Sequence, residues 1–329
     1  METGKSDSAA PYLCYIAKQR ERIEKNWLIN HRRYFSLGGV SIQVDSELPF
    51  SEQTLSSQLS TFSIDQPESD LITIHHHYHL PDLDILNDGT LVYNKAPWEI
   101  YKSDSKWYYL ANRNGHKLRE PSALAIFDQA HQHAHIFHKN DYLIRNSFFS
   151  SLTALPSDHI FLGQALADRH AVVLHSSGMI INEQGFLFVG PSGAGKSTII
   201  KLLRKYGHVT CDDRNIVRKW PDGYILHSTW SHGEINEVNN LQAPIKAIFL
   251  LQKAVQNNLT PLTNKSEILH ELILRTSRPL ITAQWLDKTL ELLADISNRI
   301  PVYQLHFTKD LRLLSVLEPI TGPLSQNSN

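Results

Sequence analysis

Residues 190–198 read Gly-Pro-Ser-Gly-Ala-Gly-Lys-Ser-Thr, a spacing typical of phosphate-binding loops. Backbone N–H groups of such a turn point at phosphate oxygens, and the N-terminus of the following helix adds partial positive charge. Lys196 adds a full charge, and the Ser197 hydroxyl is a Mg²⁺ ligand in such loops. A strand-to-helix turn without a ligand is the alternative, but the apolar run before and the helical run after the loop favour binding. The predicted phosphate contacts are Gly190, Ser192, Gly193, Ala194, Gly195, Lys196, Ser197 and Thr198.

Two adjacent carboxylates, Asp212 and Asp213, end the first strand expected after the loop helix. A kinase needs one carboxylate near the metal and one to accept the proton of the acceptor hydroxyl. Because neighbouring residues on a regular strand face opposite ways, both carboxylates reach the phosphates only if the strand ends there. We predict that they act as base and metal ligand, and the sequence does not divide these roles. An Asp-rich turn without chemistry is the alternative.

Two more residues are candidates for the same site. His175 lies on the strand expected before the loop strand, where its imidazole could point at the carboxylates, although a strand histidine is more often structural. Glu234, in the polar loop 229–234, is a weaker candidate for a metal group. The predicted catalytic residues are therefore His175, Asp212 and Asp213, and the predicted metal residues are Ser197, Asp213 and Glu234.

These elements, taken in order, resemble the catalytic core of the HPr kinase/phosphorylase family, which is related to the phosphoenolpyruvate carboxykinases. The resemblance rests on His175, the phosphate loop, Tyr206-Gly207-His208 and Asp212-Asp213. A wider resemblance, to the HPr-kinase-like subgroup that includes lasso-peptide kinases, rests on Leu37-Gly38-Gly39, Pro97-Trp98 and Trp230-Ser231-His232-Gly233-Glu234. It implies an α/β core with ATP and Mg²⁺ on the loop, a β-rich N-terminal lobe, and phosphate transfer to a hydroxyl, in particular that of serine.

Two departures from that family bear on the acceptor. Thr198 stands where HPr kinases carry an acidic metal-binding residue, and the glycine-rich stretch that they use for dephosphorylation is not recognisable after Glu234. We therefore expect a peptide, another protein or a small molecule as acceptor rather than HPr. The alternatives are a catalytically inactive, nucleotide-binding regulatory protein of the same fold and a true HPr serine kinase. The sequence has no transporter ATPase signature, and Thr263–Ser266 lacks the aspartate of a GTPase base-reading motif.

Alternating strands and helices are expected to position this chemistry in a core spanning residues 166–320. Strands are predicted at 171–181, 186–190, 208–211, 215–219, 224–228, 246–251 and 302–307. Helices are predicted at 196–206, 264–276 and 283–298, followed by a short final helix. Gly207 is predicted to cap the first of these helices.

Residues 12–165 are predicted to form an N-terminal lobe that selects the acceptor or mediates oligomer contacts. It would comprise a charged helix at 12–34, then mostly antiparallel strands to about residue 137, with helical periodicity at 141–170. The polar tails 1–11 and 321–329 are expected to be disordered.

Histidines recur at alternate positions of this lobe. His75, His77 and His79 are expected on one strand face, and His131, His133 and His135 on another. This spacing suits zinc, but no cysteine lies nearby, and a polar sheet face is the favoured interpretation.

Charge and cysteine content limit the class of protein. With 32 Lys and Arg against 33 Asp and Glu, the formal net charge is −1, so no overall field attracts nucleic acid or an anionic membrane. Two distant cysteines form no disulfide framework, and no signal peptide or run of about 20 apolar residues is present. We expect a cytoplasmic protein whose partners are a nucleoside triphosphate and a hydroxyl acceptor; homo-oligomerisation is left open.

Overall fold

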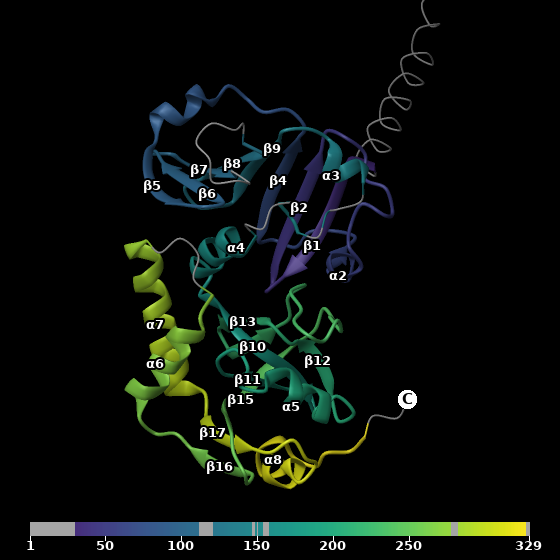
Figure 1. The fold of residues 1–329 in the computed structure, drawn as a ribbon, viewed down its shortest axis with the longest axis vertical. Helices are drawn as coiled ribbons and strands as arrows, with labels where there is room; N and C mark the ends of the chain where they lie inside the picture. The colour runs from purple at the N-terminus through teal and green to yellow at the C-terminus, as the bar shows by residue number, and fades with distance from the viewer. Residues whose placement is uncertain are drawn as a thin grey trace, which may run out of the picture.

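The computed structural model describes residues 30–111, 121–146, 149, 151–153, 158–277 and 282–326. They form a mixed α/β structure with two large β-sheets, one above the other in Figure 1. The predicted tail 1–11, residues 12–29 of the predicted helix and residues 327–329 lie outside the described part. Residues 32–34 of that predicted helix belong instead to the first strand, so the prediction is wrong there.

The first sheet contains nine strands, all from residues 32–138. Its order is β3-β1-β2-β4-β9-β8-β7-β6-β5. The pairs β2–β4 and β4–β9 are parallel, so the prediction of an antiparallel lobe is wrong in the middle of the sheet. The strands are β1 (Arg32–Leu37), β2 (Val40–Ser46), β3 (Ser63–Ile64), β4 (Leu71–His77), β5 (Thr90–Lys95), β6 (Trp98–Lys102), β7 (Lys106–Ala111), β8 (Ala123–Asp128) and β9 (His133–His138).

Short helices accompany this sheet. They are α2 (Ser57–Ser60), the 3₁₀ helix η1 (Leu83–Asp88), α3 (Tyr142–Arg145) and α4 (Asp158–Ala167). Helix α4 lies between the two sheets (Figure 1), and its Phe161 stacks on Phe127 of β8 at 5.3 Å. The same core continues into the second sheet through Val173 and Ile216, so one apolar interior joins the two halves.

The second sheet carries the predicted site. Its strands are β10 (Ala171–Ile181), β11 (Gln184–Val189), β12 (His208–Cys211), β13 (Arg214–Trp220), β14 (Gly223–His227), β15 (Gln242–Lys253), β16 (Asn258–Pro261) and β17 (Val302–Phe307). The order β11-β10-β13-β14-β15-β17-β16 is closed on itself by a parallel pairing of β11 with β15. Each predicted strand is present, and β16 is an additional one.

Strand β10 changes partners along its length. Residues 171–175 pair with β13, whereas residues 176–181 pair with β11. The change falls between His175, which pairs with Arg214, and Ser176, which pairs with Val189. The last residue of β11, Val189, and the first residue of β13, Arg214, therefore lie on opposite edges of β10, on either side of His175 and Ser176.

Four helices surround the second sheet: α5 (Lys196–Leu203), α6 (Lys265–Arg275), α7 (Ala283–Arg299) and α8 (Leu313–Thr321). Helices α6 and α7 run along one side of it and α8 lies at its lower end (Figure 1). Asn264 caps α6, and Thr282 caps α7, by accepting hydrogen bonds from backbone N–H groups. Helix α5 ends at Leu203 and not at residue 206, so Gly207 is not its cap; a Cβ there would lie 2.4 Å from the Ile180 carbonyl oxygen.

Charged contacts fasten the two sheets to each other. Asp70, just before β4, accepts hydrogen bonds from Arg169 at 2.9 Å and from Arg218 at 3.4 Å. Arg218 also donates to the Gly38 carbonyl at 2.8 Å, in the turn between β1 and β2. Gly38 and Gly39 have φ of +60° and +73°, values that a two-residue hairpin turn requires and that glycine adopts without strain.

Candidate functional site

The glycine-rich loop, residues 190–195, leaves β11 and leads directly into α5. Pro191, Ser192 and Gly193 are exposed, whereas Lys196 at the start of the helix is buried. A strand that ends in such a loop at a helix N-terminus presents several unpaired backbone N–H groups at one place. The structure thus has the strand, the loop and the helix in the predicted order.

Two glycines of this loop have no room for a Cβ. Gly195 has φ +106°, and a Cβ there would lie 2.5 Å from the phenyl ring of Phe307. A Cβ on Gly190 would lie 2.8 Å from that of Ala194. Gly193 differs, because its φ is +77° but nothing lies within 4 Å of a Cβ. Side chains would thus distort the ends of the loop, while its tip is open.

Lys196, His175 and Asp213 form a connected chain beside the loop. The Lys196 Nζ lies 3.0 Å from the His175 Nε2 and donates to the carbonyls of Gly190 and Pro191 at 3.0 and 3.2 Å. The His175 Nδ1 lies 3.2 Å from the Asp213 Oδ1 and 3.1 Å from its carbonyl oxygen. Because an ammonium only donates, His175 Nε2 is the acceptor and Nδ1 carries the proton that Asp213 accepts.

The charges in this chain depend on one another. Burial by itself would raise the pKa of Asp213, but the hydrogen bond from His175 and the positive charges of Arg214 and Lys196 hold this pKa below its usual value. Burial lowers the pKa of Lys196, and the negative charge of Asp213 opposes that effect. Asp213 is thus an ionised carboxylate at neutral pH, in contact with the His175 imidazole and held close to a cation.

Asp212 points elsewhere, although it is the next residue. Its side chain is buried, and its carboxylate accepts hydrogen bonds from the backbone N–H groups of Gly233 and Ile235, at 2.5 and 3.0 Å. The two carboxylates diverge because β12 ends at Cys211 and the chain bends before β13 begins at Arg214. The strand thus ends before the two carboxylates, as was required for both of them to reach one site. Nevertheless, only Asp213 points toward Lys196.

The segment that Asp212 holds also contacts the N-terminal lobe. Trp230 packs edge-on against Phe62 with ring centroids 5.9 Å apart, and Thr229 donates to the Arg214 carbonyl at 2.7 Å. Cys211 is the last residue of β12 before the bend, and its sulfur contacts the Ser231 carbonyl oxygen. Burial raises the pKa of this thiol to about 11. Sequence reasoning missed these supports; the Trp-x-His-Gly-Glu pattern at 230–234 was the available signal.

The other predicted metal residues have different surroundings. The Glu234 carboxylate is mostly exposed and pairs with Lys201 of α5 at 3.0 Å. Ser197 and Thr198 are half-buried in the first turn of α5. Among the described residues, no group of three or more His, Cys, Asp or Glu side chains has the arrangement of a metal centre. A magnesium site built from one or two protein ligands and phosphate oxygens does not need such a group.

Comparison with known proteins gives two findings. Residues 159–320, from α4 to α8, match the family model described as "SynChlorMet cassette protein ScmC". A solved structure, the Hpr(Ser) kinase/phosphatase from Coxiella burnetii, is similar at 12% sequence identity and a TM-score of 0.27, with 45% of this chain and 87% of that chain covered. No curated protein matches the sequence. In the described part of the chain, no helix has the length and apolar character needed to cross a membrane.

The predicted histidine faces are only partly present. His75 and His77 share the outer face of β4, and both stack on His135 of β9, at 5.1 and 5.3 Å. His79 lies beyond the end of β4, and His131 precedes β9. His131 is buried instead, with its Nε2 2.9 Å from the Tyr109 hydroxyl, so the prediction for these two residues is wrong.

A further pair of histidines is buried in the lobe. His76 and His138 stack at 5.2 Å, and His76 Nδ1 lies 2.9 Å from His138 Nε2. His76 Nε2 lies 2.9 Å from the Leu152 carbonyl oxygen. Burial lowers the pKa of His138 to about 4, so this pair is neutral in the folded protein at pH 7.

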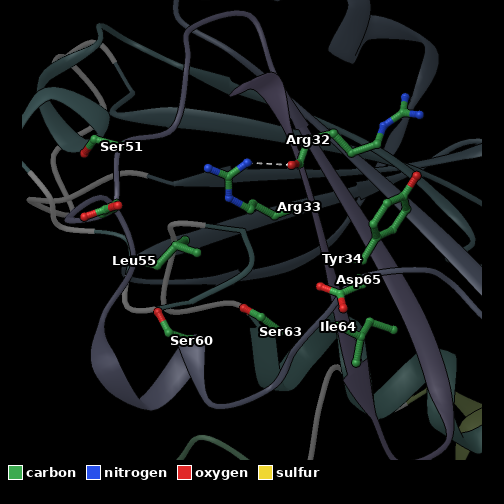
Figure 2. Close-up of a pocket in the computed structure, with 10 residues that line it drawn as sticks. Arg32, Arg33, Tyr34, Ser51, Leu55, Ser60, Ser63, Ile64 and Asp65 are labelled. Carbon is green, nitrogen blue, oxygen red and sulfur yellow. Dashed lines mark hydrogen bonds between the residues drawn. The ribbon is translucent and has the colours of Figure 1, made fainter. Parts of the chain in front are cut away.

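A cavity of 610 Å³ lies in the N-terminal lobe, apart from the glycine-rich loop. Figure 2 shows Arg33 reaching into it, where its guanidinium donates to the Arg32 carbonyl at 2.8 Å. Ser60 and Ser63 in its wall flank Phe62, the residue that contacts Trp230. The lining residues are Arg32, Arg33, Tyr34, Ser51, Glu52, Leu55, Ser60, Ser63, Ile64 and Asp65.

Proposed function

We propose that this protein is an ATP-dependent kinase that transfers the γ-phosphate to a hydroxyl group, in particular that of a serine. One observation carries the proposal: Lys196, at the end of the glycine-rich loop, lies 3.0 Å from His175, which in turn lies 3.2 Å from the Asp213 carboxylate. A phosphate-binding cation and an ionised base are thereby joined through one imidazole. That combination suits phosphoryl transfer better than it suits nucleotide binding alone.

In this proposal the loop N–H groups and Lys196 bind the β- and γ-phosphates. The acceptor hydroxyl gives its proton to Asp213 as its oxygen forms a bond to the γ-phosphorus. The bond from that phosphorus to the oxygen bridging the β- and γ-phosphates breaks, and ADP leaves. His175 donates to Asp213 and accepts from Lys196, which orients both charged groups.

Magnesium fits the donor set of this site. Ser197 offers a hydroxyl at the start of α5, and Asp213 a partly accessible carboxylate, which are the oxygen ligands that Mg²⁺ prefers beside phosphates. When bound, Mg²⁺ neutralises charge on the phosphates. Glu234 pairs with Lys201 in the last turn of α5 and stays a weaker candidate for a metal group. Asp212 serves in this proposal to hold residues 233–235 rather than to take a proton.

We assign the choice of acceptor to the N-terminal lobe. The contact between Trp230 and Phe62 supports this assignment, because it connects the segment held by Asp212 to the wall of the 610 Å³ cavity. Peptides, proteins and small molecules that carry a hydroxyl are the acceptor classes. The acidic residue that HPr kinases carry after the loop serine is replaced by Thr198, which disfavours HPr itself.

The test is label transfer from [γ-³²P]ATP with Mg²⁺ to a library of serine-containing peptides, using the full chain. We expect acid-stable label on the peptides, its loss in Asp213→Asn, and retained ATP binding in that variant. Asp222→Asn is the matched control, since Asp222 is exposed in the turn between β13 and β14.

Two outcomes contradict the proposal. If the chain does not bind ATP, the glycine-rich loop is not a nucleotide site. If it binds ATP but Asp213→Asn transfers phosphate as well as the parent does, Asp213 is not the base. Binding of ATP without transfer to any hydroxyl would favour the regulatory alternative.

A further inference from the structure

The end of α6 lies beside the glycine-rich loop, far from it in sequence. Thr276, the residue after the helix, forms a β-bridge with Leu174 of β10, and the Ser277 N–H donates to the Val173 carbonyl at 2.8 Å. Strand β11 stops at Val189, opposite Ser176. Residues 276–277 therefore continue the edge of β10 beyond the point where β11 ends and the glycine-rich loop begins.

Arg275, the last residue of α6, has a side chain that its own surroundings do not satisfy. The side chain is 18% exposed, and its Nε is buried without a hydrogen-bond partner among the described residues. One terminal nitrogen lies 3.4 Å from Glu271, a long contact. Holding a mostly buried guanidinium with an unused donor is unfavourable unless another acceptor binds it.

The charge of Arg275 acts on the predicted site. Burial lowers the pKa of Lys196 and the negative charge of Asp213 opposes this effect. The positive charge of Arg275 lowers the same pKa further. Two cations are thus held near the same loop, while the nearby Asp213 also faces Arg214. Cations beside a helix N-terminus are favourable partners for an anion with several oxygens.

We propose that Arg275 binds the terminal phosphate of the nucleoside triphosphate and makes the site distinguish a triphosphate from a diphosphate. This inference rests on the proposed nucleotide site. A guanidinium donates two parallel hydrogen bonds to phosphate, whereas Lys196 acts as a point charge. Sequence reasoning had no signal for this role, because a basic residue in the last turn of a helix is expected from the helix dipole alone.

The test compares the binding of Mg²⁺–ATP and Mg²⁺–ADP by calorimetry to the full chain. Arg275→Gln is expected to weaken ATP binding by on the order of tenfold or more, as for a lost charge-assisted pair, and ADP binding by less than about twofold. Arg275→Lys keeps the charge and stem and should lose less. Arg299→Gln, the control, removes an exposed arginine paired with Asp295 and should change neither affinity.

The outcomes separate this inference from the proposed function. If Arg275→Gln, folded by circular dichroism, leaves both affinities unchanged or weakens both equally, Arg275 does not bind the terminal phosphate. If the glutamine variant does not fold, an equal weakening of ATP and ADP binding in Arg275→Lys contradicts the inference. If the parent protein binds neither nucleotide, the proposed function fails and this inference with it. Selective loss of ATP affinity supports the inference even where no phosphate transfer is seen.

Discussion

Substituting Asp212 and Asp213 separately should produce opposite effects on stability and activity. Asp212 is buried and accepts from two backbone N–H groups, those of Gly233 and Ile235. Asp212→Ala leaves the buried Ile235 N–H without an acceptor, which costs about 1–3 kcal/mol, whereas the N–H of the exposed Gly233 can bind water instead. Since 1 kcal/mol corresponds to roughly 2–4 °C for domains of about 150–250 residues, the melting temperature should fall by several degrees or more.

Asp213→Asn should behave differently, because the Asp213 side chain is partly accessible to solvent. Its carboxylate oxygens contact His175 and, at a longer distance, Arg214. The amide keeps the shape of the side chain, so the melting temperature should change little while phosphate transfer is lost. The assays are thermal unfolding followed by circular dichroism and transfer of label from ATP, on the same preparations. Asp212→Asn gives an intermediate case, since its amide oxygen serves one of the two N–H donors.

The reasoning fails in either of two cases. Asp212→Ala with an unchanged melting temperature would mean that the carboxylate does not hold residues 233–235. A loss of stability in Asp213→Asn equal to that in Asp212→Ala would mean that the two residues share a structural role, and the division proposed above would be wrong.

Three further predictions follow from contacts described above. Gly195→Ala should abolish ATP binding and should unfold at a lower urea concentration than Gly193→Ala. The positive φ costs either alanine about 1–2 kcal/mol, but only the Cβ at position 195 also clashes with the ring of Phe307. Equal effects of the two substitutions would contradict this. Asp70→Asn should cost about 1.5–3 kcal/mol in urea unfolding, because it weakens hydrogen bonds to two arginines. Burial would raise the pKa of Asp70, but Arg169 and Arg218 outweigh burial, so this pKa is lowered in the folded state. The stability that Asp70 contributes should therefore be lost on acidification below about pH 4 in the parent protein, and the Asp70→Asn variant should not show this loss. His138, with a folded pKa of about 4 against an ordinary value near 6.5, makes the folded state bind fewer protons, so stability should fall between pH 6.5 and about 4; the melting temperature of His138→Gln should depend less on pH there.

The parts of the site that are contiguous in sequence could be predicted, and those that depend on distant contacts could not. The strand, glycine-rich loop and helix at 184–203 follow from local composition, and the structure has them in that order. The different directions of Asp212 and Asp213 depend on a bend and on N–H groups about twenty positions later. Arg275 lies near the loop only because Thr276 bridges to β10, which no spacing in the sequence encodes.

The N-terminal lobe shows the same limit in a different form. Alternating apolar residues predict a strand but not the direction of its neighbour, so the parallel pairs that β4 makes were not predictable. A shift of one position in where a strand begins also exchanges the faces. His131 is buried while His133 is exposed because β9 begins at His133, so His131 lies outside the alternation of the strand.

The strand that leads into the glycine-rich loop is hydrogen-bonded along both edges, to β10 on one side and to β15 on the other. Amide protons of residues 186–189 therefore cannot exchange with solvent by fraying of an edge; they exchange only when the closed ring of strands opens. These amides should be among the slowest in the chain, with or without nucleotide. Residues 228–241, which contain no helix or strand, are where exchange should respond to a ligand. Under the proposed function, the base of the nucleotide site is rigid, and adaptation to the acceptor falls to the segment 228–241.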